Sequence, residues 1–168
     1  MAKITILGAG TMGCAFSVPC SEKNHEIKII GTHLEDQFVE QVIQNDNFHS
    51  GLNLKLSENI KFLKHSELSK AKDNLSNLII LGVSSKGINW SVEQLKNIFS
   101  NSELPPILML TKGLNIYKNR YELLVDKLER LLLNEGFNNI NISAVGGPCL
   151  AHGLANKVHS CVVIANKD

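Results

Sequence analysis

The chain has 168 residues, of which 43% are hydrophobic, and its formal net charge is +1. This supplies enough apolar material for one domain with its own core, while the near-neutral charge argues against binding to nucleic acid or to an anionic membrane. No apolar run approaches the roughly 20 residues of a membrane-spanning helix, and the first residues show no signal-peptide pattern, so we expect a cytoplasmic protein without membrane insertion.

Short apolar runs alternate with longer amphipathic segments, which is the pattern of βαβ units around a parallel sheet. Strands are predicted over residues 4–7, 27–30, 78–83, 107–110, 142–145 and 160–164. Helices are predicted over residues 11–23, 34–45, 91–99 and 119–134, and residues 46–59 are interpreted as a loop. Most of the strands are continuous β-branched runs, as expected where helices cover both faces. The predicted fold class is therefore α/β: a Rossmann-type, doubly wound, mostly parallel sheet with helices on both faces.

The first predicted strand leads directly into GAGTMG, residues 8–13, which then opens the first predicted helix. In this GxGxxG spacing, Gly8 permits a tight turn, Gly10 lets a pyrophosphate approach the backbone, and Gly13 lets the helix pack closely on the sheet. The N–H groups at the start of the helix would face the phosphates. The motif favours dinucleotide binding over a bare tight turn.

The second predicted strand ends in GTH, where a dinucleotide-binding site specific for NAD would carry Asp or Glu. Thr32 and His33 stand there instead, and both could donate a hydrogen bond to a phosphate. The cofactor is therefore predicted to be NADP or NAD, with NADP slightly favoured. A site that discriminates little between the two is the alternative.

Three further loops follow predicted strands and should lie along the same edge of the sheet, where open α/β folds bind ligands. They are GVSSKG at 82–87, LTKGLN at 110–115 and AVGGPCLAHG at 144–153. Lys112, fixed between a strand end and a glycine, could hold an anionic substrate, although an isolated lysine is more often a solvated surface charge. The GGP turn should lead into another short helix.

The four cysteines form no CxxC pair and, with the scattered histidines, give no zinc or disulfide framework. We expect reduced structural thiols and no metal site.

Taken in order, GAGTMG, IGT, LSENI, LGVSS, LTKGL and GGPCLA resemble the cofactor-binding half of NAD(P)-dependent glycerol-3-phosphate dehydrogenase over essentially the whole chain. The most specific pair is TKG followed about 35 residues later by GPxxA. The resemblance implies reversible hydride transfer between NAD(P)H and dihydroxyacetone phosphate, which gives the sn-glycerol 3-phosphate used in phospholipid synthesis.

The resemblance also implies site residues. Lys112 would touch both cofactor and substrate, and Gly147 and Cys149 would line the substrate. The candidate cofactor contacts from the motifs and the resemblance together are Gly8, Gly10, Thr11, Met12, Gly13, Thr32, His33, Ser84, Lys112 and Ala151. The chain departs from the family at Gly146, where a serine is usual, and at Cys149, where a hydroxyl is usual and a thiol is a poorer donor.

In the family, a helical domain follows and carries the general acid/base lysine, the phosphate-binding residues and much of a homodimer interface. We therefore expect residues 1–168 to be the NAD(P)-binding Rossmann domain alone, with no catalytic residue of its own. Two alternatives stay open. One is a ketopantoate-reductase-like or other hydroxyacid-type dehydrogenase, and the other is a nucleotide-binding or sensor module that performs no chemistry.

Overall fold

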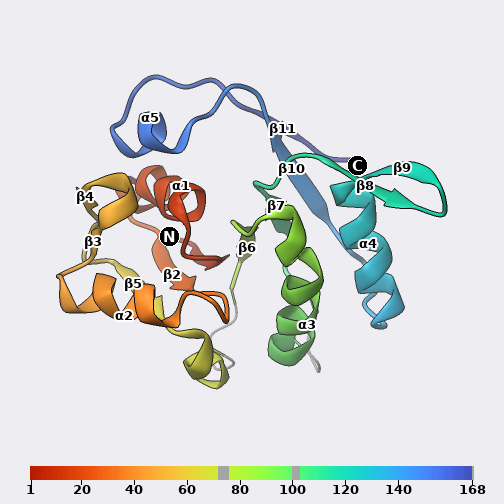
Figure 1. Ribbon diagram of the computed structural model, residues 1–168, viewed down its shortest axis with the longest axis horizontal. Helices are drawn as coiled ribbons and strands as arrows, with labels where there is room; N and C mark the ends of the chain where they lie inside the picture. The colour runs from red at the N-terminus through yellow and green to blue at the C-terminus, as the bar shows by residue number, and fades with distance from the viewer. Residues whose placement is uncertain (72–75, 100–102, 168) are drawn as a thin grey trace.

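The computed structural model describes residues 1–71, 76–99 and 103–167. Within these residues, seven strands form one sheet in the order β11-β10-β7-β6-β1-β2-β5 (Figure 1). They are β1 (Lys3–Leu7), β2 (Glu26–Ile30), β5 (Ile60–Leu63), β6 (Leu78–Leu81), β7 (Ile107–Met109), β10 (Ile142–Gly146) and β11 (Val163–Ala165). Neighbouring strands run parallel except β10 and β11, which are antiparallel. The predicted mostly parallel sheet is confirmed.

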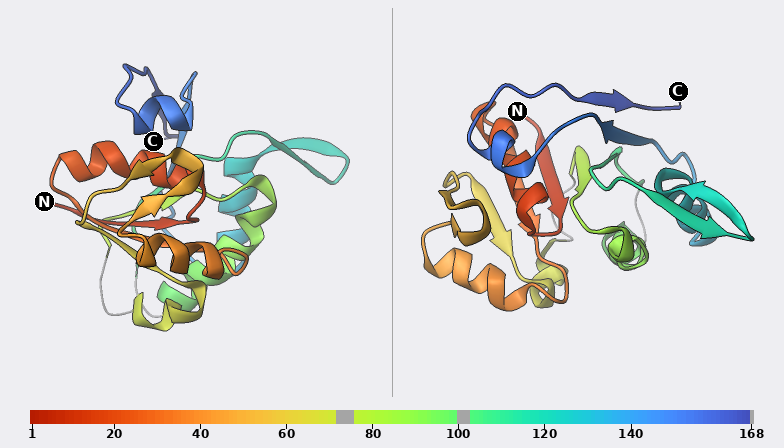
Figure 2. Two further views of the ribbon diagram at one scale, coloured as in Figure 1. Left: turned by 60° about the vertical axis from the view of Figure 1, so that its left-hand side comes forward. Right: turned by 45° about the horizontal axis from the view of Figure 1, so that its top comes forward.

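Helices cover both faces of the sheet (Figure 2). The helices are α1 (Thr11–Glu22), α2 (Asp36–Gln44), α3 (Ile88–Phe99), α4 (Leu124–Asn134) and α5 (Ala151–Ala155). Ile6 and Ile80 pack in one apolar cluster with residues of α1, α2 and α5, while Leu7 and Leu81 pack in another with α3 and α4. Successive strand residues point to opposite faces, so two buried faces require the continuous apolar runs seen in the sequence. Each fully buried side chain of this size stabilises the fold by roughly 1.5–3 kcal/mol.

The helix predicted over residues 119–134 is wrong in its first part. Residues 114–123 form an antiparallel hairpin of β8 (Leu114–Tyr117) and β9 (Arg120–Leu123), which projects beside α4 (Figure 2). Lys118 and Asn119, the two residues of its turn, have φ of +50° and +60°, the backbone that two-residue hairpins favour. Arg130 of α4 holds the hairpin through two hydrogen bonds to Glu122, at 2.8 and 3.0 Å.

The segment 46–59, interpreted as a loop, contains two short strands and a 3-10 turn. The short strands β3 (Phe48–His49) and β4 (Leu54–Lys55) pair antiparallel around a 3-10 turn, η1 (Ser50–Leu52). The sequence also missed β5, which pairs with β2. None of β3, β4 and β5 shows a long alternation of apolar and polar residues in the sequence, so these strands depend on contacts with the rest of the domain. One of these contacts places His49 beneath the glycine-rich loop.

Several of the other predicted boundaries shift by one or two residues, and two shift by three. Helix α3 begins at Ile88 rather than at residue 91, and β11 spans Val163–Ala165 rather than 160–164. The short helix expected after GGP is present as α5, which packs against α1. None of the helices within the described ranges is both long and apolar enough to cross a membrane.

Candidate functional site

A cleft lies at the carboxyl ends of the parallel strands. Its first part, of about 560 Å³, lies on the β2 side and is lined by residues from the loops after β1, β2 and β6: Gly10, Thr32, His33, Leu34, Glu35, Gly82, Val83, Ser84, Lys86, Gly87 and Trp90. Its second part, of about 440 Å³, lies on the β7 side and is lined by Gly10, Thr11, Met12, Gly82, Val83, Ser84, Leu110, Thr111, Lys112 and Cys149. Both parts share Gly10 and residues 82–84, so they flank the loops after β1 and β6 as two halves of one site.

The three glycines of the GxGxxG motif have different surroundings. Gly8 has a φ of +104°, and a Cβ on Gly13 would lie 2.6 Å from the carbonyl oxygen of Gly8, so both positions require glycine for packing beneath the cleft. A Cβ on Gly10 would have the Oε1 atom of Glu35 as its nearest neighbour, at 3.7 Å. Gly10 therefore leaves open space on the cleft side rather than a close protein contact.

Helix α1 presents its N-terminus to the cleft. It begins at Thr11 after an extended Gly10, and no side chain caps it. The N–H of Cys14 makes a 3.1 Å bond to the Gly10 carbonyl, so the N–H groups of Thr11 and Met12 precede the repeating bonds of the helix. Together with the positive end of the helix dipole, they form a site suited to a phosphate.

An acidic side chain reaches the end of β2, which corrects the sequence interpretation that none is present there. Glu35, the residue before α2, accepts hydrogen bonds at Oε2 from the N–H groups of Ala9, at 3.0 Å, and Thr32, at 2.7 Å. The Glu35 N–H in turn donates to the Thr32 carbonyl at 2.9 Å, and this turn brings the carboxylate back to the strand end. Spacing along the sequence did not reveal this contact.

Two aromatic rings, His33 and Trp90, line the β2-side cavity, and a third ring, His65, packs against both of them. The ring centroids of His33 and Trp90 are 6.1 Å apart, and His65, from the 3-10 helix η2 (His65–Ala71), lies 5.7 Å from Trp90. The Trp90 Nε1 atom is buried and has no hydrogen-bond partner among the described residues. Sequence reasoning missed His65 and Trp90, because only the fold brings η2 and the start of α3 together. Flat rings beside a polar strand end suit a planar base.

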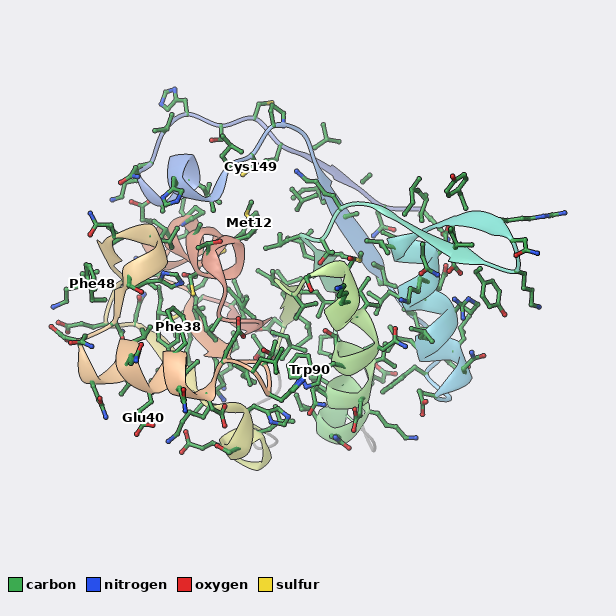
Figure 3. All side chains as sticks on the ribbon, viewed as in Figure 1. Met12, Phe38, Glu40, Phe48, Trp90 and Cys149 are labelled. Atoms are coloured by element: carbon green, nitrogen blue, oxygen red, sulfur yellow. The ribbon has the colours of Figure 1, made fainter. Side chains whose placement is uncertain are left out.

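The β7-side cavity contains the predicted lysine. The ammonium of Lys112 donates to the carbonyl oxygen of Gly147 at 2.8 Å, and the hydroxyl of Thr111 donates to the Val83 carbonyl at 2.6 Å. These bonds join the loops after β6, β7 and β10. Cys149 is only 6% exposed but lines this cavity, on the same side of the molecule as Met12 (Figure 3).

Most predicted site residues therefore meet in one cleft. Four do not line it. Gly8 and Gly13 act beneath it, Gly147 contributes a carbonyl to Lys112, and Ala151 begins α5, packed against the apolar cluster on the α1 face. In the described part of the chain, no group of three or more His, Cys, Asp or Glu side chains could hold a metal ion.

Comparisons with known proteins agree with this geometry. The family model described as NAD-dependent glycerol-3-phosphate dehydrogenase N-terminus matches residues 3–168. The NADP(+)-dependent glycerol-3-phosphate dehydrogenase of Archaeoglobus fulgidus is 26% identical over 163 residues, which are 97% of this chain and 46% of that protein. The NAD(P)+ glycerol-3-phosphate dehydrogenase of Francisella philomiragia is 27% identical over 168 residues, 99% of this chain and 46% of that protein.

Among solved structures, a glycerol-3-phosphate dehydrogenase from Coxiella burnetii superimposes with a TM-score of 0.77 at 19% identity. The superposition covers 99% of this chain and 47% of that one, and at this identity it supports the fold alone. The chain thus spans about half the length of the relatives that it matches.

Proposed function

Because this chain belongs to the NAD-dependent glycerol-3-phosphate dehydrogenase family and matches its N-terminal part, we propose that residues 1–168 form the NAD(P)-binding Rossmann domain of such an enzyme. The enzyme would interconvert dihydroxyacetone phosphate and sn-glycerol 3-phosphate. The observation that carries the proposal is the two-part cleft centred on Gly10 and the N-terminus of α1. The match over residues 3–168 also favours this interpretation over a ketopantoate-reductase-like enzyme.

The residues of the cleft fit a nicotinamide dinucleotide. The N–H groups of Thr11 and Met12 would hold the pyrophosphate, the adenosine would lie in the β2-side cavity against Thr32 and His33, and the nicotinamide would lie in the β7-side cavity near Ser84. When bound, the cofactor supplies or accepts the hydride. The role of Ala151 as a cofactor contact stays a prediction.

The cofactor is NAD or NADP. The slight preference for NADP depended on the absence of an acid at the end of β2, and the carboxylate of Glu35 lies there. A carboxylate near the adenosine end disfavours a 2′-phosphate by like-charge repulsion, while Lys86 and His33 line the same cavity and would attract it. The surroundings therefore support binding of both forms.

The substrate would lie beside Lys112. Its ammonium has three donors, of which the bond to Gly147 uses one, so it can hold the anionic group of a phosphorylated ketone while it stays anchored. Cys149 lines the same cavity as Lys112, and Gly147 accepts the hydrogen bond from Lys112, so both would lie beside the substrate. In this position Lys112 binds and orients the substrate, and the proton donor is a different group.

This chain covers about 46% of the length of each relative, so the relatives have room for a second domain. The general acid/base lysine is proposed to lie in a helical substrate domain of this kind. Phospholipid synthesis as the purpose of the reaction, a homodimeric full-length enzyme and a cytoplasmic location belong to the same proposal.

Titration calorimetry with NADH and NADPH tests the binding function. We expect one nucleotide per chain, and no heat with either nucleotide would contradict the proposal. In a longer form of the protein that includes the proposed helical domain, the nucleotide-loaded protein should also bind dihydroxyacetone phosphate, and no response to the ketone there would favour a non-catalytic nucleotide-binding module.

An activity assay tests the division into domains. Residues 1–168 alone should oxidise NADPH with dihydroxyacetone phosphate far below the range of about 1–10³ s⁻¹ that enzymes show, because a positioned general acid contributes roughly 10²–10⁴-fold. Turnover within that range would mean that the proton donor lies in these residues.

A further inference from the structure

The two backbone polar groups of Ala9, inside the glycine-rich loop, are both held by side chains. Its N–H donates to Oε2 of Glu35 at 3.0 Å. Its carbonyl oxygen lies 3.3 Å from Nε2 of His49 and 3.3 Å from the Sγ atom of Cys14. Ala9 is fully buried, so these contacts fix the orientation of the backbone immediately before Gly10.

Glu35 connects two loops with one oxygen atom. Oε2 accepts from Ala9, in the loop after β1, and from Thr32, in the loop after β2. Hydrogen bonds to a carboxylate are roughly twice as strong as neutral ones. The second oxygen, Oε1, lies beside Gly10 at the edge of the cleft. Glu35 therefore holds the two loops that form the β2 side of the site.

His49 binds the carbonyl oxygen of Ala9. Its Nδ1 accepts the N–H of Leu52 at 3.1 Å, so the ring proton is on Nε2 and is donated to the Ala9 carbonyl. Burial lowers the pKa of His49, which keeps the ring neutral and both bonds intact. The Phe38 ring, labelled in Figure 3, packs edge-on against the imidazole at 4.9 Å.

Cys14 completes the set as a donor. Burial, together with the nearby charge of Glu35, raises the pKa of its thiol, so the sulfur keeps its proton and donates it to Ala9. A neutral imidazole and a protonated thiol thus donate to the Ala9 carbonyl, while the Glu35 carboxylate accepts from the Ala9 N–H.

We propose that Glu35 and His49 are positioning residues of the nucleotide site. By binding the N–H and the carbonyl of Ala9, they fix the orientation of the backbone at Gly10 and of the first N–H groups of α1, which face the cleft. A loop that is already ordered costs less free energy to organise when the ligand binds. The inference rests on the proposed binding of a nicotinamide dinucleotide in this cleft.

Glu35 variants test the proposal, with NADH and NADPH affinities measured by calorimetry and the melting temperature measured for each variant. Glu35→Ala removes both bonds and should weaken NADH binding by about tenfold or more; NADPH binding should fall less, because the variant also removes a charge that repels the 2′-phosphate. Glu35→Gln keeps an oxygen that can accept both N–H groups, so its affinity for NADH should stay within about threefold of wild type. Glu40→Ala, in the helix that follows Glu35 and exposed beside Lys64, is the matched control and should bind as wild type.

Two outcomes would overturn the positioning role. One is a folded Glu35→Ala variant with wild-type affinities. The other is a Glu35→Gln variant that loses as much affinity for NADH as Glu35→Ala, because that result would mean that Glu35 acts through its charge. If Glu35→Ala does not fold, Glu35→Met keeps the side-chain length without oxygens and replaces it. A wild-type chain that binds neither nucleotide would instead contradict the proposed function itself.

Discussion

Replacing Gly10 with valine puts a branched side chain where the loop after β1 opens onto the cleft. The backbone of Gly10, with φ of −68° and ψ of 171°, is one that valine adopts without strain. The Cβ atom would meet nothing closer than the Glu35 carboxylate oxygen, at 3.7 Å. The free energy of unfolding should therefore stay within about 1 kcal/mol of wild type.

Nucleotide binding should fall steeply in Gly10→Val. The valine would occupy the approach of the pyrophosphate to the N–H groups of Thr11 and Met12. A hydrogen bond to a charged group contributes roughly 1.5–3 kcal/mol, so the loss of two costs about 3 kcal/mol or more, which weakens binding by about 100-fold. Calorimetry with NADH, alongside thermal unfolding, measures both quantities on the same variant.

Gly13→Ala is the matched contrast, because its Cβ would lie 2.6 Å from the backbone oxygen of Gly8. This variant should lose roughly 1–3 kcal/mol of stability through overpacking, whereas Gly10→Val should lose affinity. A folded Gly10→Val chain that binds NADH within threefold of wild type would refute the reasoning, since it would mean that the ligand does not approach Gly10.

Three further predictions follow from the β7-side cavity and from the buried histidine. In a form of the protein that includes the proposed helical domain, Lys112→Ala should weaken binding of dihydroxyacetone phosphate to the NADH-loaded protein by about tenfold or more in calorimetry. Lys96→Ala, an exposed lysine of α3 paired with Glu135, should change nothing, and equal losses in both would argue against the assignment. Bound NADH should protect Cys149 from alkylation, while the exposed Cys161 stays reactive, and mass spectrometry measures the extent of alkylation at each cysteine. Equal alkylation of Cys149 with and without NADH would mean that the ligand binds elsewhere. The pKa of His49 is lowered in the fold below its ordinary value of 6.5, so the unfolded chain binds more protons below that pH. The contribution of neutral His49 to stability is therefore complete above pH 6.5 and declines as the pH falls. The melting temperature of His49→Gln should fall less steeply toward acidic pH than the melting temperature of the wild type. Parallel curves of melting temperature against pH would contradict this prediction.

Local signals were sufficient to predict most of the sheet and the centre of the candidate site. The strands that became β1, β2, β6, β7 and β10 are short, mostly apolar runs, and the GxGxxG motif fixes its own turn because Gly8 and Gly13 have no room for a side chain. The TKG loop could be placed because parallel strands end at the same edge of a sheet.

Contacts between distant segments were not predictable in the same way. Leu123, the last residue of the hairpin, continues the helical leucine pattern of α4, so the pattern extended the predicted helix into the hairpin. The ion pair between Glu122 and Arg130, which links the hairpin to α4, is a contact that the leucine pattern does not show. The Glu35 carboxylate reaches the glycine-rich loop through a turn that sequence spacing does not reveal. His49 lies in a segment without periodicity, and its burial depends on that same loop.

A crystal structure of the chain with NADH bound tests the central claim most directly. The claim predicts the pyrophosphate at the N–H groups of Thr11 and Met12, the adenine beside His33 and Trp90, and the nicotinamide ring beside Lys112. A nucleotide that lies away from Gly10, or that runs through the cleft in the opposite direction, would contradict it.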